Sequence, residues 1–301
     1  MKKVILFGTG NGSKEYLLKY GSELDVVAIV DNDKEKEGTI YQDNLIISSP
    51  SSIASFDYDE IIIVSQWAKE ISSQLEKELN VDISKIYIPP KKDIKDVQRP
   101  FEDPNTRELA REIIKKLSYY AIEDNIPLLV DFGTLLGIVR DNDVILWDDD
   151  VDFSIVNLPL DVEFETWLLN AIGKINLPVN LNIKSKIVDN KQVSFILFFK
   201  HESYKTFSIS ISLRELKDDR YIHLPSGGMW YSPQKFFDKY EIIEWDKHKV
   251  MVPFCYKEYL EFLYGDWKKP KKDITMTDYA NLGEVKYEDF IKSGDGYKEI
   301  M

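Results

Sequence analysis

The most unusual feature of the sequence is a run of four aspartates within five residues, Asp148, Asp149, Asp150 and Asp152. Carboxylates this close repel one another, and two unit charges 5 Å apart cost roughly 3 kcal/mol at an effective dielectric of 20. Side chains alternate between the two faces of a strand, so Asp148, Asp150 and Asp152 are expected on one face. Asp149 has the opposite parity and is expected to orient a neighbour or to face solvent. A divalent cation on the shared face would offset the repulsion.

A glycine turn precedes these acids and adds groups suited to phosphate. Gly133 and Thr134 are expected between a strand at 126–132 and a short helix at 134–140. Gly133 lets the backbone approach a ligand, and the Thr134 hydroxyl can cap the helix or bond a phosphate oxygen. Arg140 offers a planar fork for phosphate.

The turn and the acids together favour a site for Mg²⁺, or Mn²⁺, and a substrate phosphate. The plainer alternative is a solvated acidic turn between two strands.

A second glycine turn lies near the N-terminus. Gly8, Gly10 and Gly12 follow an expected strand and open an expected helix, and Asp31 ends the next strand. In dinucleotide-binding folds, backbone N–H groups of such a turn hold a pyrophosphate and the acid holds a ribose. NAD or another nucleotide is therefore a candidate cofactor here. Ser13 replaces the third glycine of the fingerprint, so a tight turn that only packs the helix on the sheet stays open as the alternative.

The elements that position these groups divide the chain into two domains. Residues 1–90 alternate apolar runs rich in Val and Ile with helical patterns, which predicts a parallel α/β sheet with right-handed crossovers. This segment resembles the N-terminal Rossmann-like units of several bacterial sugar- and polysaccharide-modifying enzymes. Residues 91–104 carry prolines and many charges and are expected to form a linker. Residues 105–301 begin with an amphipathic helix and continue as α+β.

Composition excludes several classes of protein. The chain has 301 residues with 44% hydrophobic and 30% charged content, which is typical of a folded globular protein. Its net charge of −13 disfavours nucleic acid as a partner. No apolar run approaches the roughly 18 residues of a membrane span, so no integral membrane segment and a cytoplasmic location are expected. The single cysteine and the three scattered histidines, read as surface or packing residues, form no zinc pattern.

The stretch from about residue 106 to 270 resembles the LicD family, the nucleotidyltransferase-fold group that includes bacterial phosphocholine transferases and fukutin-like proteins. The matching motifs are GTLLGIVR, WDDDVD, MWYSPQKFF and VMVPFCYKEYLEFLYGDWKKP. The resemblance implies an α+β nucleotidyltransferase-like domain with a mixed sheet. It also implies that Asp150 and Asp152 bind metal with Asp148 close by, and that Gly133 and Thr134 hold the donor phosphate.

One departure from the family pattern concerns a later strand, where the family carries a further aspartate. Here Ser208, Ser210 and Ser212 occupy the polar positions of the expected strand 207–213. A third carboxylate is therefore missing where the resemblance places one. This puts the identity of the general base in doubt.

Together with these features, the resemblance implies a Mg²⁺-dependent transferase that moves a phospho-alcohol group, phosphocholine or a similar unit, from a CDP-linked donor to a sugar hydroxyl of a bacterial surface glycan or its precursor. Asp150 and Asp152 would hold metal on the diphosphate, Arg140 would stabilise the leaving CMP, and Asp148 is a candidate proton acceptor. A nucleotidyltransferase with the same fold and metal is the close alternative. Two more distant alternatives remain. One is a catalytically silent protein that binds a sugar nucleotide. The other is a dinucleotide-dependent oxidoreductase or epimerase whose cofactor binds to the first domain.

Overall fold

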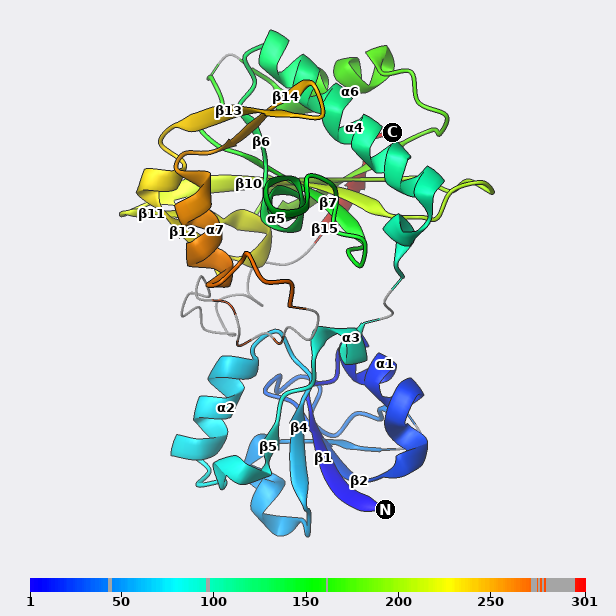
Figure 1. Cartoon of the computed structure of the whole chain (residues 1–301). Helices are drawn as coiled ribbons and strands as arrows, with labels where there is room; N and C mark the ends of the chain where they lie inside the picture. Colours follow the sequence, from blue (N-terminus) through cyan, green and yellow to red (C-terminus); the bar gives the residue numbers. More distant parts are fainter. Residues whose placement is uncertain are drawn as a thin grey trace. The chain divides into compact units, whose positions relative to one another are not determined.

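The computed structural model describes residues 1–42, 45–95, 98–160, 162–271, 275, 277, 279 and 296–301, and it divides the chain into two compact units (Figure 1). The first unit comprises Met1–Val97 and Pro270–Tyr279, and the second comprises Gln98–Lys269 and Ala280–Met301. Each unit contains its own β-sheet.

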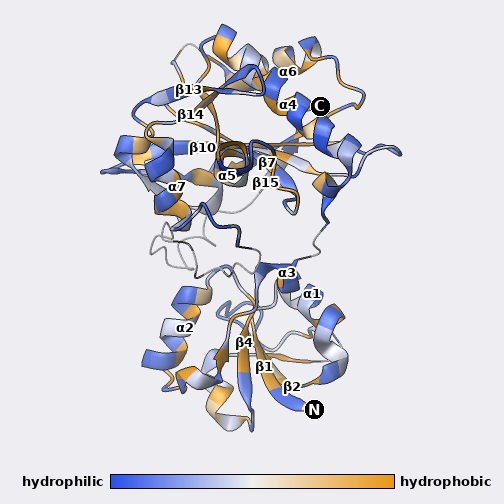
Figure 2. Ribbon diagram, in the orientation of Figure 1, coloured by the Kyte–Doolittle hydropathy of each residue, from blue (hydrophilic) through white to orange (hydrophobic). Residues whose placement is uncertain are grey.

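The first unit is a parallel sheet of five strands in the order β3-β2-β1-β4-β5. The strands are β1 Lys2–Phe7, β2 Leu24–Val30, β3 Ile47–Ser48, β4 Glu60–Ile63 and β5 Ile86–Tyr87. Figure 2 shows β1 and β4 as mostly hydrophobic, as expected for strands that are buried on both faces. This is the Rossmann-like α/β fold that the alternating pattern predicts.

The helices of the first unit follow from the same topology. They are α1 Asn11–Tyr20, α2 Ala68–Lys77 and the short α3 Lys91–Ile94. The chain moves from β1 to β2 in one direction along the sheet and from β4 to β5 in the other, so right-handed crossovers place α1 and α2 on opposite faces. Residues 91–104, expected as a linker, contain α3 and a 3₁₀ turn, Pro100–Glu102.

The second unit is built on a mixed sheet of ten strands. The main path is β13-β14-β6-β7-β10-β9-β8-β15, and β11 joins it through β10 and carries β12. The β7–β10 and β14–β6 pairs are parallel, and the other pairs are antiparallel. The strands are β6 Leu128–Val130, β7 Asp150–Ile155, β8 Asn182–Val188, β9 Lys191–Phe198, β10 Ser208–Lys217, β11 Arg220–His223, β12 Tyr231–Pro233, β13 Tyr240–Trp245, β14 His248–Pro253 and β15 Gly296–Glu299.

Four helices pack on this sheet: α4 Pro104–Glu123, α5 Phe132–Asp141, α6 Phe164–Lys174 and α7 Tyr256–Tyr264. Leu109, Ile113 and Leu117 line one side of α4 and are buried in the core, as the helical spacing predicts. Helices α4 and α6 lie side by side (Figure 1).

Helix α5 begins earlier than the sequence pattern suggests. The strand expected at 126–132 ends at Val130, and the helix expected at 134–140 starts at Phe132. The cause is Asp131, whose carboxylate accepts a hydrogen bond from the Phe132 backbone N–H and caps the helix. Inside α5, Gly137 lets the following loop pass close to the helix backbone.

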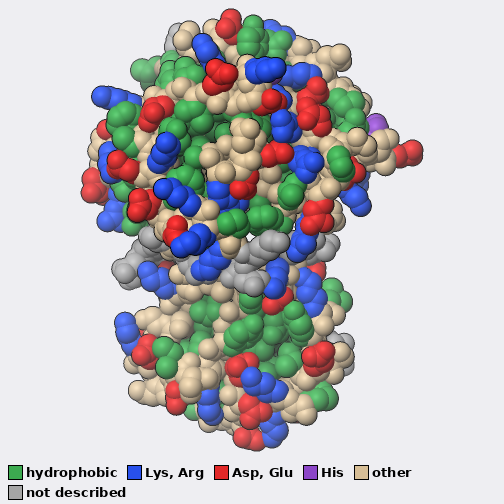
Figure 3. Space-filling view, viewed as in Figure 1, with side chains coloured by type: hydrophobic (Ala, Val, Ile, Leu, Met, Phe, Trp, Pro, Cys, Tyr) green, Lys and Arg blue, Asp and Glu red, His purple; other side chains and the backbone are tan. Residues whose placement is uncertain are grey.

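The surface of the second unit carries acidic and basic side chains that are interspersed on the face shown in Figure 3. Within the described part of the chain, no helix has both the length and the apolar character needed to span a bilayer.

The close approach at Gly137 makes a prediction about stability. A Cβ there would lie 2.5 Å from the Asp143 carbonyl oxygen and 2.9 Å from the Ile145 backbone nitrogen. Because both are backbone atoms that cannot move aside cheaply, Gly137→Ala is expected to lower the free energy of unfolding by about 1–3 kcal/mol. Urea denaturation measures this.

Gly173 in α6 is the matched control, since a Cβ there would meet no atom within 4 Å. Gly173→Ala is expected to stabilise the protein by about 0.5–1 kcal/mol through helix propensity. Equal effects at the two positions would contradict the packing role assigned to Gly137.

Candidate active site

Three carboxylates of the aspartate run converge in the structure. Asp148, Asp149 and Asp150 each offer an oxygen that lies within 4.8 Å of the other two, and all three side chains are partly exposed. Asp148 and Asp149 belong to the turn before β7, so the strand alternation expected for Asp149 does not hold there. Asp150 and Asp152 do share one face of β7, opposite the buried Val151. Asp152 is not one of the three that converge.

The converging acids lie against the first turn of α5. A Cβ on Gly133 would overlap Asp148 Oδ2, so glycine leaves room for this carboxylate where it now lies. Helix N-termini carry unpaired N–H groups and partial positive charge, which favour anions. The turn and the acid cluster therefore form one site.

Thr134 joins α5 to β7. Its hydroxyl oxygen accepts a hydrogen bond of 2.8 Å from the Asp152 backbone N–H, and the residue is buried. Asp131 caps the helix, so the expectation that Thr134 does so is wrong. Thr134 instead fixes the backbone of β7 between Asp150 and Asp152.

Arg140 lies at the other end of α5, and its guanidinium is engaged by its neighbour. Nε and Nη2 donate to the two carboxylate oxygens of Asp141 at 2.8 and 2.7 Å. The guanidinium carbon also lies 5.7 Å from the centre of the Trp147 ring. The fork that was expected to face phosphate therefore faces Asp141 in this structure.

Strand register shows where the missing third acid would stand. In the parallel β7–β10 pair, Ser208 lies opposite Asp150 and Ser210 lies opposite Asp152. Registered neighbours project from the same face of a sheet. Serine hydroxyls, not a carboxylate, therefore border the two acids on this side.

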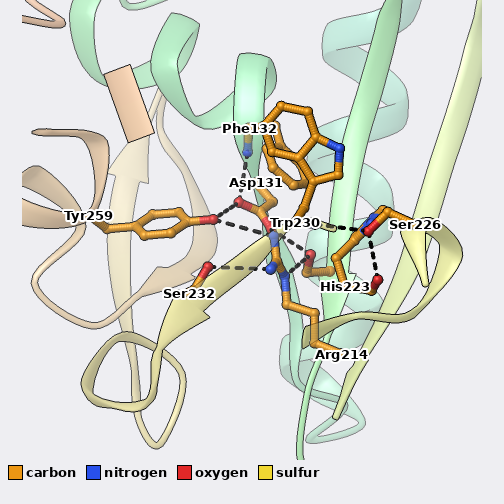
Figure 4. Close-up of polar contacts among 9 residues, drawn as sticks. Asp131, Phe132, Arg214, His223, Ser226, Trp230, Ser232 and Tyr259 are labelled. Carbon is orange, nitrogen blue, oxygen red and sulfur yellow. Dashed lines mark hydrogen bonds and ion pairs between the residues drawn. The ribbon is translucent and has the colours of Figure 1, made fainter. Parts of the chain in front are cut away.

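Beneath the acids lies a buried polar network centred on Asp131 and Arg214 (Figure 4). Arg214 Nη2 donates to Asp131 Oδ2 at 2.7 Å, and both side chains are completely buried. Asp131 also accepts hydrogen bonds from Ser154 in β7 and from the Tyr259 hydroxyl in α7, the latter at 2.7 Å. Ser232 in β12 accepts from Arg214 Nη1 at 3.3 Å. One ion pair thus connects α5, β7, β10, β12 and α7.

Aromatic rings enclose the Arg214 guanidinium, whose central carbon lies 5.0 Å from the centre of the Phe132 ring and 4.7 Å from that of Phe237. Phe132 has a backbone φ of +44°, which bulky side chains rarely adopt. Such strain costs on the order of 1–3 kcal/mol and persists where surrounding contacts impose it. Phe132 directly precedes Gly133, so the network sets the path of the backbone into the site.

Electrostatics in the network follow from burial and pairing. Burial opposes ionisation of Asp131, but the Arg214 charge and the Ser154 and Tyr259 hydrogen bonds outweigh it and lower the pKa of this carboxyl. Burial, reinforced by the Asp131 charge, holds the pKa of the Tyr259 hydroxyl well above its usual value. Both groups therefore keep their charge states at neutral pH.

His223 lies at the edge of this network. Burial and, secondarily, the charge of Arg214 lower the pKa of the imidazole to about 3. Its ring packs edge-on to Phe132 at 5.7 Å, and its Nδ1 atom has no hydrogen-bond partner among the described residues. The imidazole is therefore neutral at neutral pH, and His223 is a half-buried packing residue at the edge of the site.

Several of these residues were missed from the sequence, although two signals pointed to them. Arg214 continues the parity of the three serines on β10, so a charge on that face was visible. Asp131 precedes the glycine turn directly, where a helix cap belongs. Nothing local to Tyr259 or Ser154 indicates their shared partner.

In the first unit, Asp31 is engaged by the glycine turn itself. Its Oδ2 accepts hydrogen bonds from the backbone N–H and the hydroxyl of Thr9, at 3.0 and 2.5 Å. A Cβ on Gly8 would lie 2.6 Å from the Val64 carbonyl oxygen, and one on Gly12 would lie 3.0 Å from the Val64 side chain. A Cβ on Gly10 would meet no atom within 4 Å. Packing therefore explains Gly8 and Gly12 but not Gly10.

Comparison with known families agrees with the fold of the second unit. Residues 125–256 match the model described as the LicD/FKTN/FKRP nucleotidyltransferase domain, so the second unit carries a nucleotidyltransferase domain. That domain belongs to the LicD family, as its motifs predicted. Residues 1–87 match the model described as C2185-like, N-terminal.

Solved structures with some similarity include two bacterial dehydrogenases. UDP-D-quinovosamine 4-dehydrogenase from Vibrio fischeri is 23% identical over 30% of this chain and 78% of its own, with a TM-score of 0.24. UDP-N-acetylglucosamine 3-dehydrogenase from Acidithiobacillus ferrooxidans is 13% identical over 83% of this chain and 82% of its own, also with a TM-score of 0.24. Scores this low carry no argument about function. A comparison with curated protein sequences found no match.

The buried ion pair predicts a large effect of removing one partner. Arg214→Met leaves the Asp131 charge buried without its counter-ion and is expected to lower the free energy of unfolding by about 3–5 kcal/mol. Urea denaturation measures the loss. The control is Lys235→Met, which breaks the exposed Lys235–Glu258 pair of 2.9 Å and should cost at most about 1 kcal/mol. Similar losses in both variants would contradict the role of Arg214.

His223 predicts a pH dependence. Because its pKa is about 3 in the folded chain and about 6.5 when unfolded, the unfolded chain takes up a proton first as the pH falls. Stability is unaffected above pH 6.5 and decreases towards pH 3, by up to about 1.4 kcal/mol per pH unit.

His223→Gln removes this titration, so its free energy of unfolding should fall less steeply than that of the wild type between pH 6.5 and 3. Denaturant titrations at several pH values compare the two slopes. If the free energy of unfolding fell equally steeply with pH in both proteins, His223 would not be held neutral by burial.

Proposed function

We propose that the second unit is a Mg²⁺-dependent transferase that moves a phospho-alcohol group, phosphocholine or a similar unit, from a CDP-linked donor to a sugar hydroxyl of a bacterial surface glycan or its precursor. LicD-family membership indicates a transferase in glycan biosynthesis. The observation that carries the finer proposal is the convergence of Asp148, Asp149 and Asp150 at the N-terminal turn of α5.

The donor set fits a hard divalent cation. All the converging groups are carboxylate oxygens, which Mg²⁺ and Mn²⁺ prefer, and they leave room for phosphate oxygens of a substrate. We assign the cation to Asp148 and Asp150, with Asp152 added from the same face of β7 and Asp149 alongside. A bound cation would offset the charge of the donor diphosphate.

The residues of the chain divide the remaining tasks. Gly133 leaves room for the Asp148 carboxylate beside the first turn of α5, where the donor phosphate would bind, and Thr134 holds the β7 backbone that carries the acids. A carboxylate of the cluster accepts the proton of the attacking sugar hydroxyl, which needs a base within hydrogen-bond reach. Arg140 would serve the leaving group only after exchanging its Asp141 contact for phosphate, an exchange between two bidentate anions.

A silent nucleotide-binding protein is the second candidate, and the serines beside Asp150 and Asp152 favour it. A nucleotidyltransferase is the close rival, because the same site would transfer a nucleotide in place of the phospho-alcohol. Product analysis with a donor labelled in either half separates the two enzymes. Absence of metal-dependent donor cleavage would favour the silent protein.

For the first unit we propose nucleotide binding at the glycine turn as a separate property, with NAD among the candidates. Gly10 supports it, because a Cβ there would meet no atom of the described residues within 4 Å. The Thr9 hydrogen bonds to Asp31 weigh against a ribose contact of the ordinary kind.

Asp150→Asn tests the proposed transferase directly. Replacing this carboxylate with an amide removes a charged cation ligand and is expected to lower donor cleavage at least about 10³-fold, a transition-state loss of about 4 kcal/mol. Chromatographic release of CMP from CDP-choline, CDP-glycerol and CDP-ribitol, with and without Mg²⁺, measures turnover.

The control is Asp189→Asn, at an exposed position in the turn between β8 and β9. It should cleave donors at the wild-type rate, and both variants should unfold at the wild-type temperature. Near-normal cleavage by Asp150→Asn would remove the metal-site proposal.

A further inference from the structure

The face of β7 that carries Asp150 and Asp152 extends across three neighbouring strands of the sheet. On the face that carries Asp150 and Asp152, side chains of β8, β9, β10 and β7 line up in rows. The rows are Asn182, Phe198, Ser208 and Asp150; then Lys184, Ile196, Ser210 and Asp152; then Lys186, Ser194, Ser212 and Ser154. We refer to Ser194, Ile196 and Phe198 of β9 with Ser208, Ser210 and Ser212 of β10 as the polar strip.

The two faces of these strands are differently buried. The opposite face packs into the core, where Leu197, Ile209 and Val151 are completely buried. On the strip, Phe198, Ile196, Ser208 and Ser210 remain partly exposed. The strip is therefore an accessible surface that begins next to the acids.

The deeper end of the strip is more enclosed than its outer end. Ser194 and Ser212 are only 4% and 7% exposed. Within the described part of the chain, the four strip serines make no side-chain hydrogen bond, and none of their oxygens is among the fully buried atoms without a partner. These hydroxyls therefore stay accessible to a ligand that supplies donors and acceptors.

The chemistry of the strip matches a sugar. Serine hydroxyls can pair with sugar hydroxyls, while Phe198 and Ile196 offer apolar contact to the carbon skeleton. Lys184, whose ammonium lies 5.0 Å from the centre of the Phe198 ring, adds a donor at the far side. This mixture of hydroxyl and aromatic groups differs from the carboxylates and helix terminus that suit the donor diphosphate.

The order of strands separates the two substrates. Helix α5 follows β6, which flanks β7 on one side, and the strip flanks β7 on the other. Neighbouring strands are about 4.8 Å apart, so Phe198 stands about 10 Å from Asp150, with room for a sugar between them. An acceptor on the strip would approach the acids from the side opposite to α5. In-line phosphoryl transfer requires attack from opposite the leaving group.

We propose that the polar strip is the binding site for the acceptor sugar, a neutral hexose or N-acetylhexosamine residue; this rests on the transferase function proposed above. The sugar lies on Phe198 and Ile196, and its hydroxyls pair with Ser208 and Ser210. Its attacking hydroxyl points to the acid cluster. The serines that replace the expected third carboxylate thus serve the acceptor rather than the cation.

Sugar binding is tested on the full chain without any reaction. Saturation-transfer NMR is recorded with methyl glycosides of glucose, galactose, N-acetylglucosamine and N-acetylgalactosamine. The wild type is expected to give a transfer signal with at least one of them. Ser208→Ala combined with Ser210→Ala, and separately Phe198→Leu, should reduce that signal at least about fivefold. These changes are small, and thermal unfolding checks that the variants fold.

The control combines Ser51→Ala in the first unit with Tyr240→Leu on the outermost strand β13, and it should leave the signal unchanged. No signal from any glycoside with the wild type, or an undiminished signal in both strip variants, would overturn the assignment. CMP release in the absence of sugar is measured on the wild type and on the control variant, and the two rates should be the same. Because that release tests the transferase without any acceptor, failure of the proposed function and failure of the strip are read separately.

Discussion

The ion pair between Asp131 and Arg214 is the interaction on which the site depends. Taking two charges out of water is costly unless they are paired and their remaining donors and acceptors are satisfied. Here Ser154, Ser232 and Tyr259 supply those hydrogen bonds from three further elements. The geometry that satisfies the pair therefore also fixes where α5, β7, β10, β12 and α7 meet (Figure 4).

The buried ion pair also fixes the positions of the acids, through the start of α5. Asp131 caps α5 and is followed by Phe132 in a strained conformation, so the first turn of the helix has one path. That path brings Gly133 against Asp148, while Thr134 binds the β7 backbone at Asp152. The repulsion among the carboxylates is thus opposed by a rigid frame and by the positive end of α5. A site organised before substrate arrives loses less energy in ordering when the substrate binds.

The sequence predicted those features that depend on periodicity, and it missed those that depend on partners. Alternating Val and Ile runs indicated the parallel sheet, and strand parity placed Asp150 and Asp152 on one face. Parity failed for Asp149, because Asp148 and Asp149 belong to a turn and not to the strand. The packing of His223 against Phe132 depends on segments that meet only in the folded chain, so no local pattern reveals it. The engagement of Arg140 by Asp141 joins adjacent residues, and it follows from the side-chain geometry at the end of α5 rather than from any periodicity.

Charge repulsion explains why β10 carries serines beside the acids of β7. A carboxylate at position 210 would stand next to Asp152, at the cross-strand distance of about 5 Å, and would add to the repulsion among the four aspartates of this short segment. The turn before β7 brings Asp148 and Asp149 to Asp150, so the proposed cation site would not need a further acid from the next strand. A neutral hydroxyl at that position lets an uncharged ligand lie directly beside the acids without burying another charge. On the proposed function, the departure from the family pattern would leave the cation to the acids of the turn and of β7, and it would leave β10 available for the second substrate.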